Sequence, residues 1–146
     1  MLKILLSAFL LTGWFNIEWH HDLKEAETIA KSEHRFILLN FSGSDWCGPC
    51  IRMHKEIFND DVFRHFADSS LVMVNADFPR MRKNQLPPQQ QQLNDAMADQ
   101  YNPKGKFPLT LLLTADGKVL KTWDGFPDGG APAFTQQVRT ITAAGN

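Results

Sequence analysis

The sequence predicts an α/β domain in which helices cover both faces of a central mixed β-sheet. Two short runs, residues 36–41 and 71–76, are apolar almost throughout, which is typical of strands buried on both faces of a sheet. Two β-rich runs near the C-terminus are joined through Asp116-Gly117, a strong hairpin signal. The 146 residues, 43% of them hydrophobic, suffice for one ordinary globular domain.

Hydrophobic periodicity and turn signals predict the order helix, strand, helix, strand, helix, strand, strand, helix. This order corresponds to a βαβ unit followed by a ββα unit, and the two together give a mixed sheet. The expected elements are a helix over residues 22–33, a strand over 36–41, a helix that follows Cys50 and breaks near 59–61 into a second piece, a strand over 71–76, a helix over 93–101, strands over 109–114 and 119–123, and a helix over 132–142.

Local signals at the ends of these elements support the boundaries. Asp22 followed by Glu25 resembles a capping box at the start of the first helix. Asp60 can cap the second piece of the interrupted helix. Asn102-Pro103 predicts the end of the helix that precedes it, because proline cannot continue a helix.

The patch from Pro87 to Gln92 is of low complexity and has no apolar periodicity. We interpret it as part of a surface insertion around residues 79–92, because surface loops accept extra chain at little entropic cost. A permissive loop explains this composition better than a binding role does.

The charge composition argues against nucleic acid as a partner. Fifteen basic and 16 acidic residues leave a formal net charge of −1. Such a chain has no positive excess with which to neutralise a phosphate backbone. A monomer is the simplest expectation for the oligomeric state.

The N-terminal residues have the pattern of a secretory signal peptide. Lys3 is followed by an apolar stretch over residues 4–15, which is shorter than the roughly 20 residues of a membrane-spanning helix. We expect residues 1–15 to be a signal peptide and residues 16–146 to form the exported domain. This predicts an extracytoplasmic, periplasmic location.

The two cysteines of the chain occur together in Trp46-Cys47-Gly48-Pro49-Cys50, directly after the first apolar strand and at the start of a helix. Two cysteines at this spacing can close a disulfide ring. The unpaired N–H groups and partial positive charge of a helix N-terminus favour the Cys47 thiolate, which is the reactive form. Cys47 is therefore the predicted nucleophile and Cys50 the resolving thiol. Gly48 keeps side chains clear of a substrate, and Pro49 suits an early helical position.

From Ile17 onward, the chain resembles the thioredoxin superfamily through this five-residue motif and through Lys106-Phe107-Pro108 before the hairpin. It resembles the exported, disulfide-isomerase-like branch more than cytosolic thioredoxin. The resemblance implies the thioredoxin fold, a cis peptide bond before Pro108, and presentation of the Phe107 backbone to an extended substrate. The expected substrate-binding residues are Trp46, Gly48, Pro49, Phe107 and Pro108.

Two departures from the thioredoxin pattern stand near the motif. Asn40 occupies the position that matches a buried aspartate of thioredoxin, and an amide cannot act as a base. The loop from Ser42 to Asp45 is one residue longer than the matching thioredoxin loop. We interpret Asp45 as a loop cap rather than as a replacement base.

The sequence therefore predicts an enzyme that reduces or isomerises disulfides in cysteine-containing proteins and contributes to redox homeostasis. The Cys47–Cys50 couple needs no cofactor, and no metal site is expected. Gly48-Pro49 resembles the reducing end of the family, so the expected electron donor in an oxidising compartment is a membrane thiol-reducing protein.

Three alternatives stay open. A dedicated reductase for cytochrome c maturation would prefer clients that contain Cys-x-x-Cys-His. A metal-binding carrier could use Cys47, Cys50 and His54 as ligands. An interaction module that merely kept the motif would work without Cys47.

Overall fold

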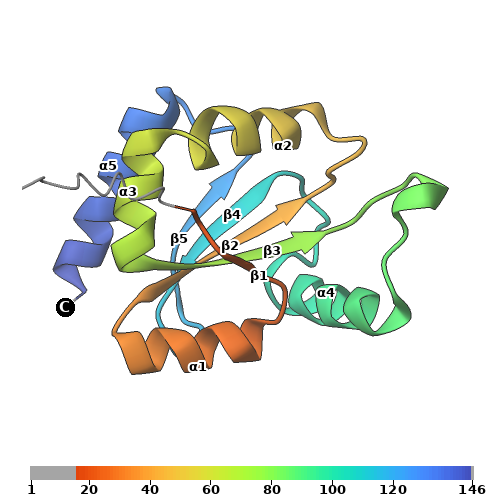
Figure 1. Ribbon diagram of the computed structural model, residues 1–146, viewed down its shortest axis with the longest axis horizontal. Helices are drawn as coiled ribbons and strands as arrows, with labels where there is room; N and C mark the ends of the chain where they lie inside the picture. The colour runs from red at the N-terminus through yellow and green to blue at the C-terminus, as the bar shows by residue number, and fades with distance from the viewer. Residues whose placement is uncertain (1–15, 146) are drawn as a thin grey trace, which may run out of the picture.

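The computed structural model describes residues 16–145, which form a five-stranded sheet flanked by helices (Figure 1). The strands are β1 (Trp19–His20), β2 (Phe36–Ser42), β3 (Leu71–Asp77), β4 (Leu109–Leu113) and β5 (Val119–Asp124). The helices are α1 (Leu23–Glu33), α2 (Gly48–Met53), α3 (Asp61–Ser70), α4 (Pro88–Tyr101) and α5 (Gly130–Ala144), with a π-helical turn η1 (His54–Phe58) and a 3-10 turn η2 (Arg82–Asn84).

The signal peptide expected at residues 1–15 lies outside the described residues. Between residues 16 and 145, no helix has both the length and the apolar character needed to cross a membrane.

Strand β2 lies at the centre of the sheet, whose order is β1-β3-β2-β4-β5. β1, β3 and β2 run parallel to one another. β4 is antiparallel to β2, and β5 is antiparallel to β4. The structure thereby confirms the predicted mixed sheet, with a βαβ unit followed by a ββα unit.

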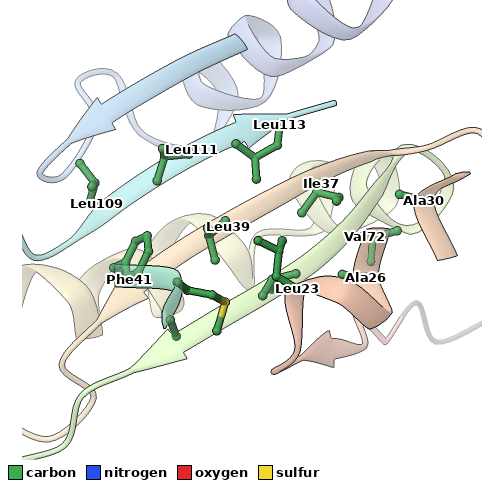
Figure 2. Close-up of a cluster of buried hydrophobic side chains, with 13 residues drawn as sticks. Leu23, Ala26, Ala30, Ile37, Leu39, Phe41, Val72, Leu109, Leu111 and Leu113 are labelled. Atoms are coloured by element: carbon green, nitrogen blue, oxygen red, sulfur yellow. The ribbon is translucent and has the colours of Figure 1, made fainter. Parts of the chain in front are cut away.

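Alternate residues of β2 pack into two different hydrophobic cores. Leu39 and Phe41 belong to a cluster that also contains residues of α1 and α4, and Figure 2 shows this cluster between the sheet and α1. Leu38 belongs to a second cluster, on the opposite face, with residues of α3 and α5. All three side chains are fully buried. This two-sided burial is the reason why the strand is a continuous apolar run rather than an alternating one.

The expectation of a loop at residues 87–92 is wrong for residues 88–92, which form the first part of α4. Pro88 is in the first turn of that helix, where its missing N–H needs no partner. The glutamines are good helix formers, but most of this segment is exposed or half-buried. Apolar periodicity is therefore absent, and the sequence pattern could not detect the helical turn.

Strand β1 was not predicted from the sequence. It has two residues at the edge of the sheet, and Trp19 and His20 pair with Met73 and Val74 of β3. Two residues are too few to produce a recognisable alternation. The remaining predicted elements match the observed ones to within about two residues at each end, which is the usual uncertainty of such boundaries.

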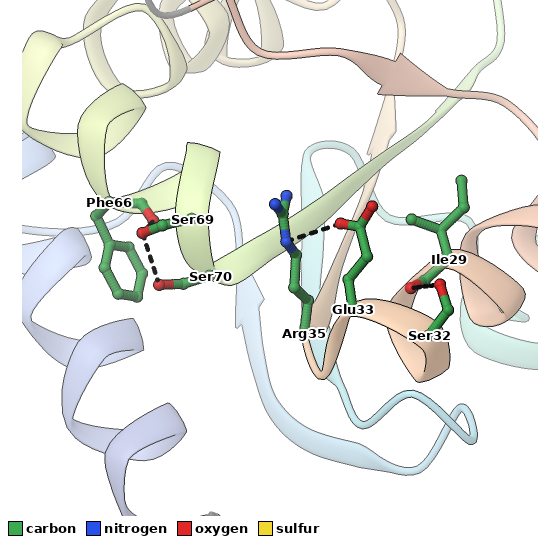
Figure 3. A network of polar contacts seen from close by, with 7 residues as sticks. All are labelled: Ile29, Ser32, Glu33, Arg35, Phe66, Ser69 and Ser70. Atoms are coloured by element: carbon green, nitrogen blue, oxygen red, sulfur yellow. Dashed lines mark hydrogen bonds and ion pairs between the residues drawn. The ribbon is translucent and has the colours of Figure 1, made fainter.

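Polar contacts stabilise the chain just before β2, at the end of the sheet opposite the cysteine pair (Figure 3). Arg35 forms an ion pair of 2.9 Å with Glu33. The Ser32 hydroxyl donates to the Ile29 carbonyl at 2.9 Å. His34 ends α1 in the left-handed conformation, with φ 55°. These short-range contacts set the turn between α1 and β2.

Truncation of Leu39 tests the two-sided burial of β2. We expect Leu39→Ala to lower the free energy of unfolding by about 2–5 kcal/mol, because it leaves a cavity in a packed core. Val119, which is 43% exposed on β5, is the matched control, and Val119→Ala should cost about 1 kcal/mol or less. Denaturant unfolding measures both values, and equal losses would contradict the assignment of β2 as the core strand.

Candidate active site

Cys47 and Cys50 form a disulfide where the loop after β2 enters α2. Their Cα atoms are 5.2 Å apart. Cys47 is the N-cap of α2, and its sulfur accepts the Cys50 N–H at 3.3 Å. The exposed fractions are 5% for Cys47 and 1% for Cys50. The sulfur of Cys47 therefore lies at the N-terminus of the helix, and Cys50 lies inside its first turn.

Strand register brings the segment before β4 to the same edge of the sheet as the disulfide. Phe41 near the end of β2 pairs with Leu109 at the start of β4. The peptide bond between Phe107 and Pro108 is cis, as the resemblance implied. Pro108 is buried and Phe107 is half-buried.

Aromatic contacts join the cysteine loop to the segment that contains the cis bond. The Trp46 and Phe107 rings meet edge to face, with centroids 5.4 Å apart. Trp46 Nε1 donates to the Phe78 carbonyl at 2.7 Å, and the Phe78 and Phe107 rings are also in edge contact. A Cβ atom at Gly43 would lie 2.3 Å from the Trp46 ring. Gly43, which sequence reasoning missed, therefore leaves the space that the indole occupies.

Gly48 and Pro49 are both exposed beside the disulfide. A Cβ atom at Gly48 would meet nothing within 4 Å, so the surface above the first turn of α2 is open. The structure thus brings together Trp46, the cysteine pair and Phe107, whereas Gly48 and Pro49 contribute open surface.

Asp45 connects the cysteine loop to the segment that follows β3. Its carboxylate accepts the backbone N–H groups of Arg80 and Met81 and the side-chain amide of Asn84, each at 2.9 Å. These hydrogen bonds, led by the one from Arg80, lower the pKa of Asp45. These side-chain hydrogen bonds of Asp45 thus cap a second loop, 35 residues away, rather than its own. The guanidinium of Arg80 in turn lies over the Trp46 ring, 3.5 Å from its centroid.

Sequence reasoning missed the involvement of the segment after β3. A signal was present, because β2 and β3 were expected to be parallel neighbours, and the chain segments that follow such strands emerge at the same edge of a sheet. Ser42 at the end of β2 pairs with Asp77 at the end of β3. The two loops that follow these residues are for this reason neighbours.

Asn40 is fully buried, and its amide is hydrogen-bonded on both sides. Thr110 Oγ1 donates to Asn40 Oδ1 at 3.0 Å, and Asn40 Nδ2 donates to Asn75 Oδ1 at 3.3 Å. Ser42 Oγ connects the same Asn75 oxygen to Asp77. The position that matches the aspartate of thioredoxin thus holds a satisfied neutral group without basic character.

His54 and Cys50 both line a cavity of about 220 Å³ beside α2. The His54 ring packs against Trp19 and Phe58, with centroids 5.1 and 5.2 Å away. Burial lowers the pKa of His54, and the negative charge of Asp77 partly opposes this effect. Among residues 16–145, no three His, Cys, Asp or Glu side chains are grouped as ligands of a metal ion would be.

A larger cavity of about 480 Å³ lies elsewhere, with Glu33, Arg35 and Leu71 in its wall and neither cysteine. Glu33 is the last residue of α1 and Arg35 directly precedes β2, at the far end from the disulfide. The smaller cavity is therefore the one that concerns the cysteine chemistry.

A family model described as a thioredoxin-like domain matches residues 23–140. The chain belongs to the thioredoxin-like family. Disulfide bond reductase DsbH of Chlamydia pneumoniae is 39% identical over 125 residues, which are 86% of this chain and 72% of that protein.

Solved structures of thioredoxin-like proteins have the same fold. A DsbH oxidoreductase superimposes with a TM-score of 0.78 and 38% identity, over 88% of this chain and 85% of that one. A thioredoxin from Thermus thermophilus gives a TM-score of 0.66 at 15% identity, over 89% of this chain and 90% of that one. The predicted thioredoxin fold is confirmed. With its Cys47–Cys50 disulfide, this thioredoxin-like chain is a thiol–disulfide oxidoreductase.

The buried position of His54 makes stability depend on pH. Unfolded His54 takes up a proton as the pH falls below about 6.5, whereas folded His54, with its lowered pKa, does so only at lower pH. The free energy of unfolding should therefore fall between pH 6.5 and the pKa of the folded residue. His54→Phe keeps a ring beside Trp19 and Phe58 but cannot titrate, so its unfolding free energy should change less between pH 8 and pH 5. Equal changes in both proteins would contradict this assignment.

Proposed function

We propose that the protein is an exported reductase of protein disulfides, with Cys47 as the nucleophile and Cys50 as the resolving thiol. The observation that carries the proposal is the Cys50 N–H, which points at the Cys47 sulfur from the first turn of α2. In the reduced protein the same N–H and the helix N-terminus would stabilise a thiolate on Cys47. Cys50 has no comparable position, because it lies inside the first turn of α2 and its own N–H is the donor to Cys47.

The reaction proceeds through two thiol–disulfide exchanges. The Cys47 thiolate attacks a client disulfide, the client S–S bond breaks, and the first client sulfur leaves as a thiolate that takes a proton from water. Cys50 then loses its proton and attacks the Cys47 sulfur. The mixed disulfide breaks, the second client thiol leaves, and Cys47 and Cys50 have given two electrons to the client.

The proton of Cys50 needs an acceptor in the second exchange. Asn40 cannot serve, because an amide is not a base. The cavity of about 220 Å³ that Cys50 lines has room for water. We assign the proton transfer to water in this cavity.

The client binds as an extended segment along Phe107 and Pro108, with Trp46 beside it. The ring contact between Trp46 and Phe107 supports this location, because it joins the cysteine loop to the segment with the cis bond. Open surface at Gly48 supports it as well. No cofactor takes part, since the electrons come from the two thiols.

The proposal also assigns a direction of electron flow and a location. The relative DsbH is called a disulfide bond reductase, and this name supports reduction over isomerisation. The signal-peptide pattern of residues 1–15 supports export. A reductase in an oxidising compartment must be reduced again after each turnover, and a membrane thiol-reducing protein would supply those electrons.

Single cysteine substitutions test the assignment of the two roles. Cys50→Ser should accumulate a mixed disulfide with a client protein, because no thiol remains to resolve it. Cys47→Ser should form no such adduct and should lose nearly all reductase activity. Non-reducing electrophoresis and mass analysis of the adducts measure both results. Accumulation of the adduct by Cys47→Ser instead would reverse the two roles.

The reduction potential of the couple tests the direction. We expect a value near about −270 mV, the thioredoxin end of the scale, when the protein is equilibrated in thiol–disulfide buffers and its free thiols are counted. A value near about −180 mV or higher would group the protein with isomerases and oxidants. That result would overturn the reductase assignment but leave the exchange chemistry in place.

A further inference from the structure

The turn after β3 carries three cations, Arg80, Arg82 and Lys83, all of them exposed. We call these three residues the basic turn. They follow one another within four positions of a chain whose net charge is only −1. Among residues 16–145, no Asp or Glu side chain forms an ion pair with any of the three. No carboxylate of the described residues therefore neutralises these three charges.

The cysteine loop holds the basic turn in place. Asp45 accepts the N–H groups of Arg80 and Met81 and the amide of Asn84, which closes the 3-10 turn η2 against the loop. Both Asp45 oxygens are used in these contacts, so this carboxylate faces the turn's own N–H groups. Trp46 adds a further link through its hydrogen bond to the Phe78 carbonyl. Two residues of the loop before α2, Asp45 and Trp46, therefore hold the basic turn in place.

The basic turn lies along the surface that we assign to the client. Arg80 stacks on Trp46 at 3.5 Å, and the Trp46 ring also contacts Phe107. A segment bound along Phe107 therefore passes the ring that carries the Arg80 guanidinium. Met81, next to Arg80, is 49% exposed and offers apolar surface between the charges.

We propose that the basic turn is a docking surface for clients that carry carboxylates next to the disulfide to be reduced. This inference rests on the proposed reductase function, and it adds a rule of client selection to it. Unlike charges at the edge of a binding surface mainly raise the rate of association, and salt weakens their effect. The cations would hold an acidic client segment beside Cys47 while the exchange takes place.

The test uses three synthetic peptides with the same internal disulfide, flanked on both sides by Glu, Gln or Lys. The reduced protein is mixed with each peptide, and acid-quenched samples give the second-order rate constant of peptide reduction. At about 0.01 M ionic strength, we expect the Glu peptide to react about threefold or more faster than the Gln peptide, and the Lys peptide to react more slowly. At about 1 M the screening length falls to about 3 Å, and the differences should nearly vanish.

Two double variants separate the basic turn from the overall charge. Arg82→Gln with Lys83→Gln removes two cations of the turn and leaves Arg80 on Trp46. Lys118→Gln with Lys121→Gln removes the same amount of charge elsewhere. Both lysines are exposed; Lys118 directly precedes β5 and Lys121 lies within it. We expect the first variant to lose most of the preference for the Glu peptide and the second to keep it. The control variant, Lys118→Gln with Lys121→Gln, should reduce the Gln peptide at the wild-type rate. Arg82→Gln with Lys83→Gln should lose more rate with the Glu peptide than with the Gln peptide.

Several outcomes would overturn the proposal. Equal rates for the three peptides, or equal losses in the two double variants, would show that the basic turn selects no acidic client. Binding to anionic lipid vesicles that depends on Arg82 and Lys83, without a preference among peptides, would assign the turn to a membrane surface. If the Gln peptide itself is not reduced, the proposed reductase function fails, and this inference fails with it.

Discussion

The pairing of β2 with a strand on each side is the constraint on which the rest of the structure depends. β3 runs parallel to β2, so Ser42 and Asp77 end their strands side by side. β4 runs antiparallel, so Leu109 begins its strand beside Phe41. Three chain segments far apart in the sequence therefore meet at one edge of the sheet. These segments carry the disulfide, the basic turn and the cis bond.

Two kinds of interaction organise this edge. Polar side chains beneath it satisfy one another: Thr110 donates to Asn40, Asn40 to Asn75, and Ser42 links Asn75 to Asp77. Such a network is stable in a buried site because each polar group has a partner. Above it, ring contacts and the Asp45 hydrogen bonds position the groups that a client would meet. Asn40, a neutral amide, stands in this network where thioredoxin has an aspartate. For this reason our proposal assigns the proton of Cys50 to water.

The sequence was sufficient for elements whose burial is complete or whose ends are marked by turn residues. The strand around Leu39 was predicted because both of its faces are buried, which leaves a continuous apolar run. The start of α4 was missed because its glutamines are largely solvent-facing and show no periodicity. β1 was missed because Trp19 and His20 obtain their strand conformation from β3 alone. The cis bond before Pro108 followed only from the family resemblance, since proline itself favours trans.

The sequence by itself determined the disulfide couple. Cys47 and Cys50 are three positions apart, and a single helical turn is enough to bring them together. Only the tertiary structure decided that Asp45 and Trp46 hold Arg80, because these residues are more than thirty positions apart. That contact requires the ends of β2 and β3 to emerge in register at one edge. Register is a property of the assembled sheet, so it cannot be predicted from the residues of either loop alone.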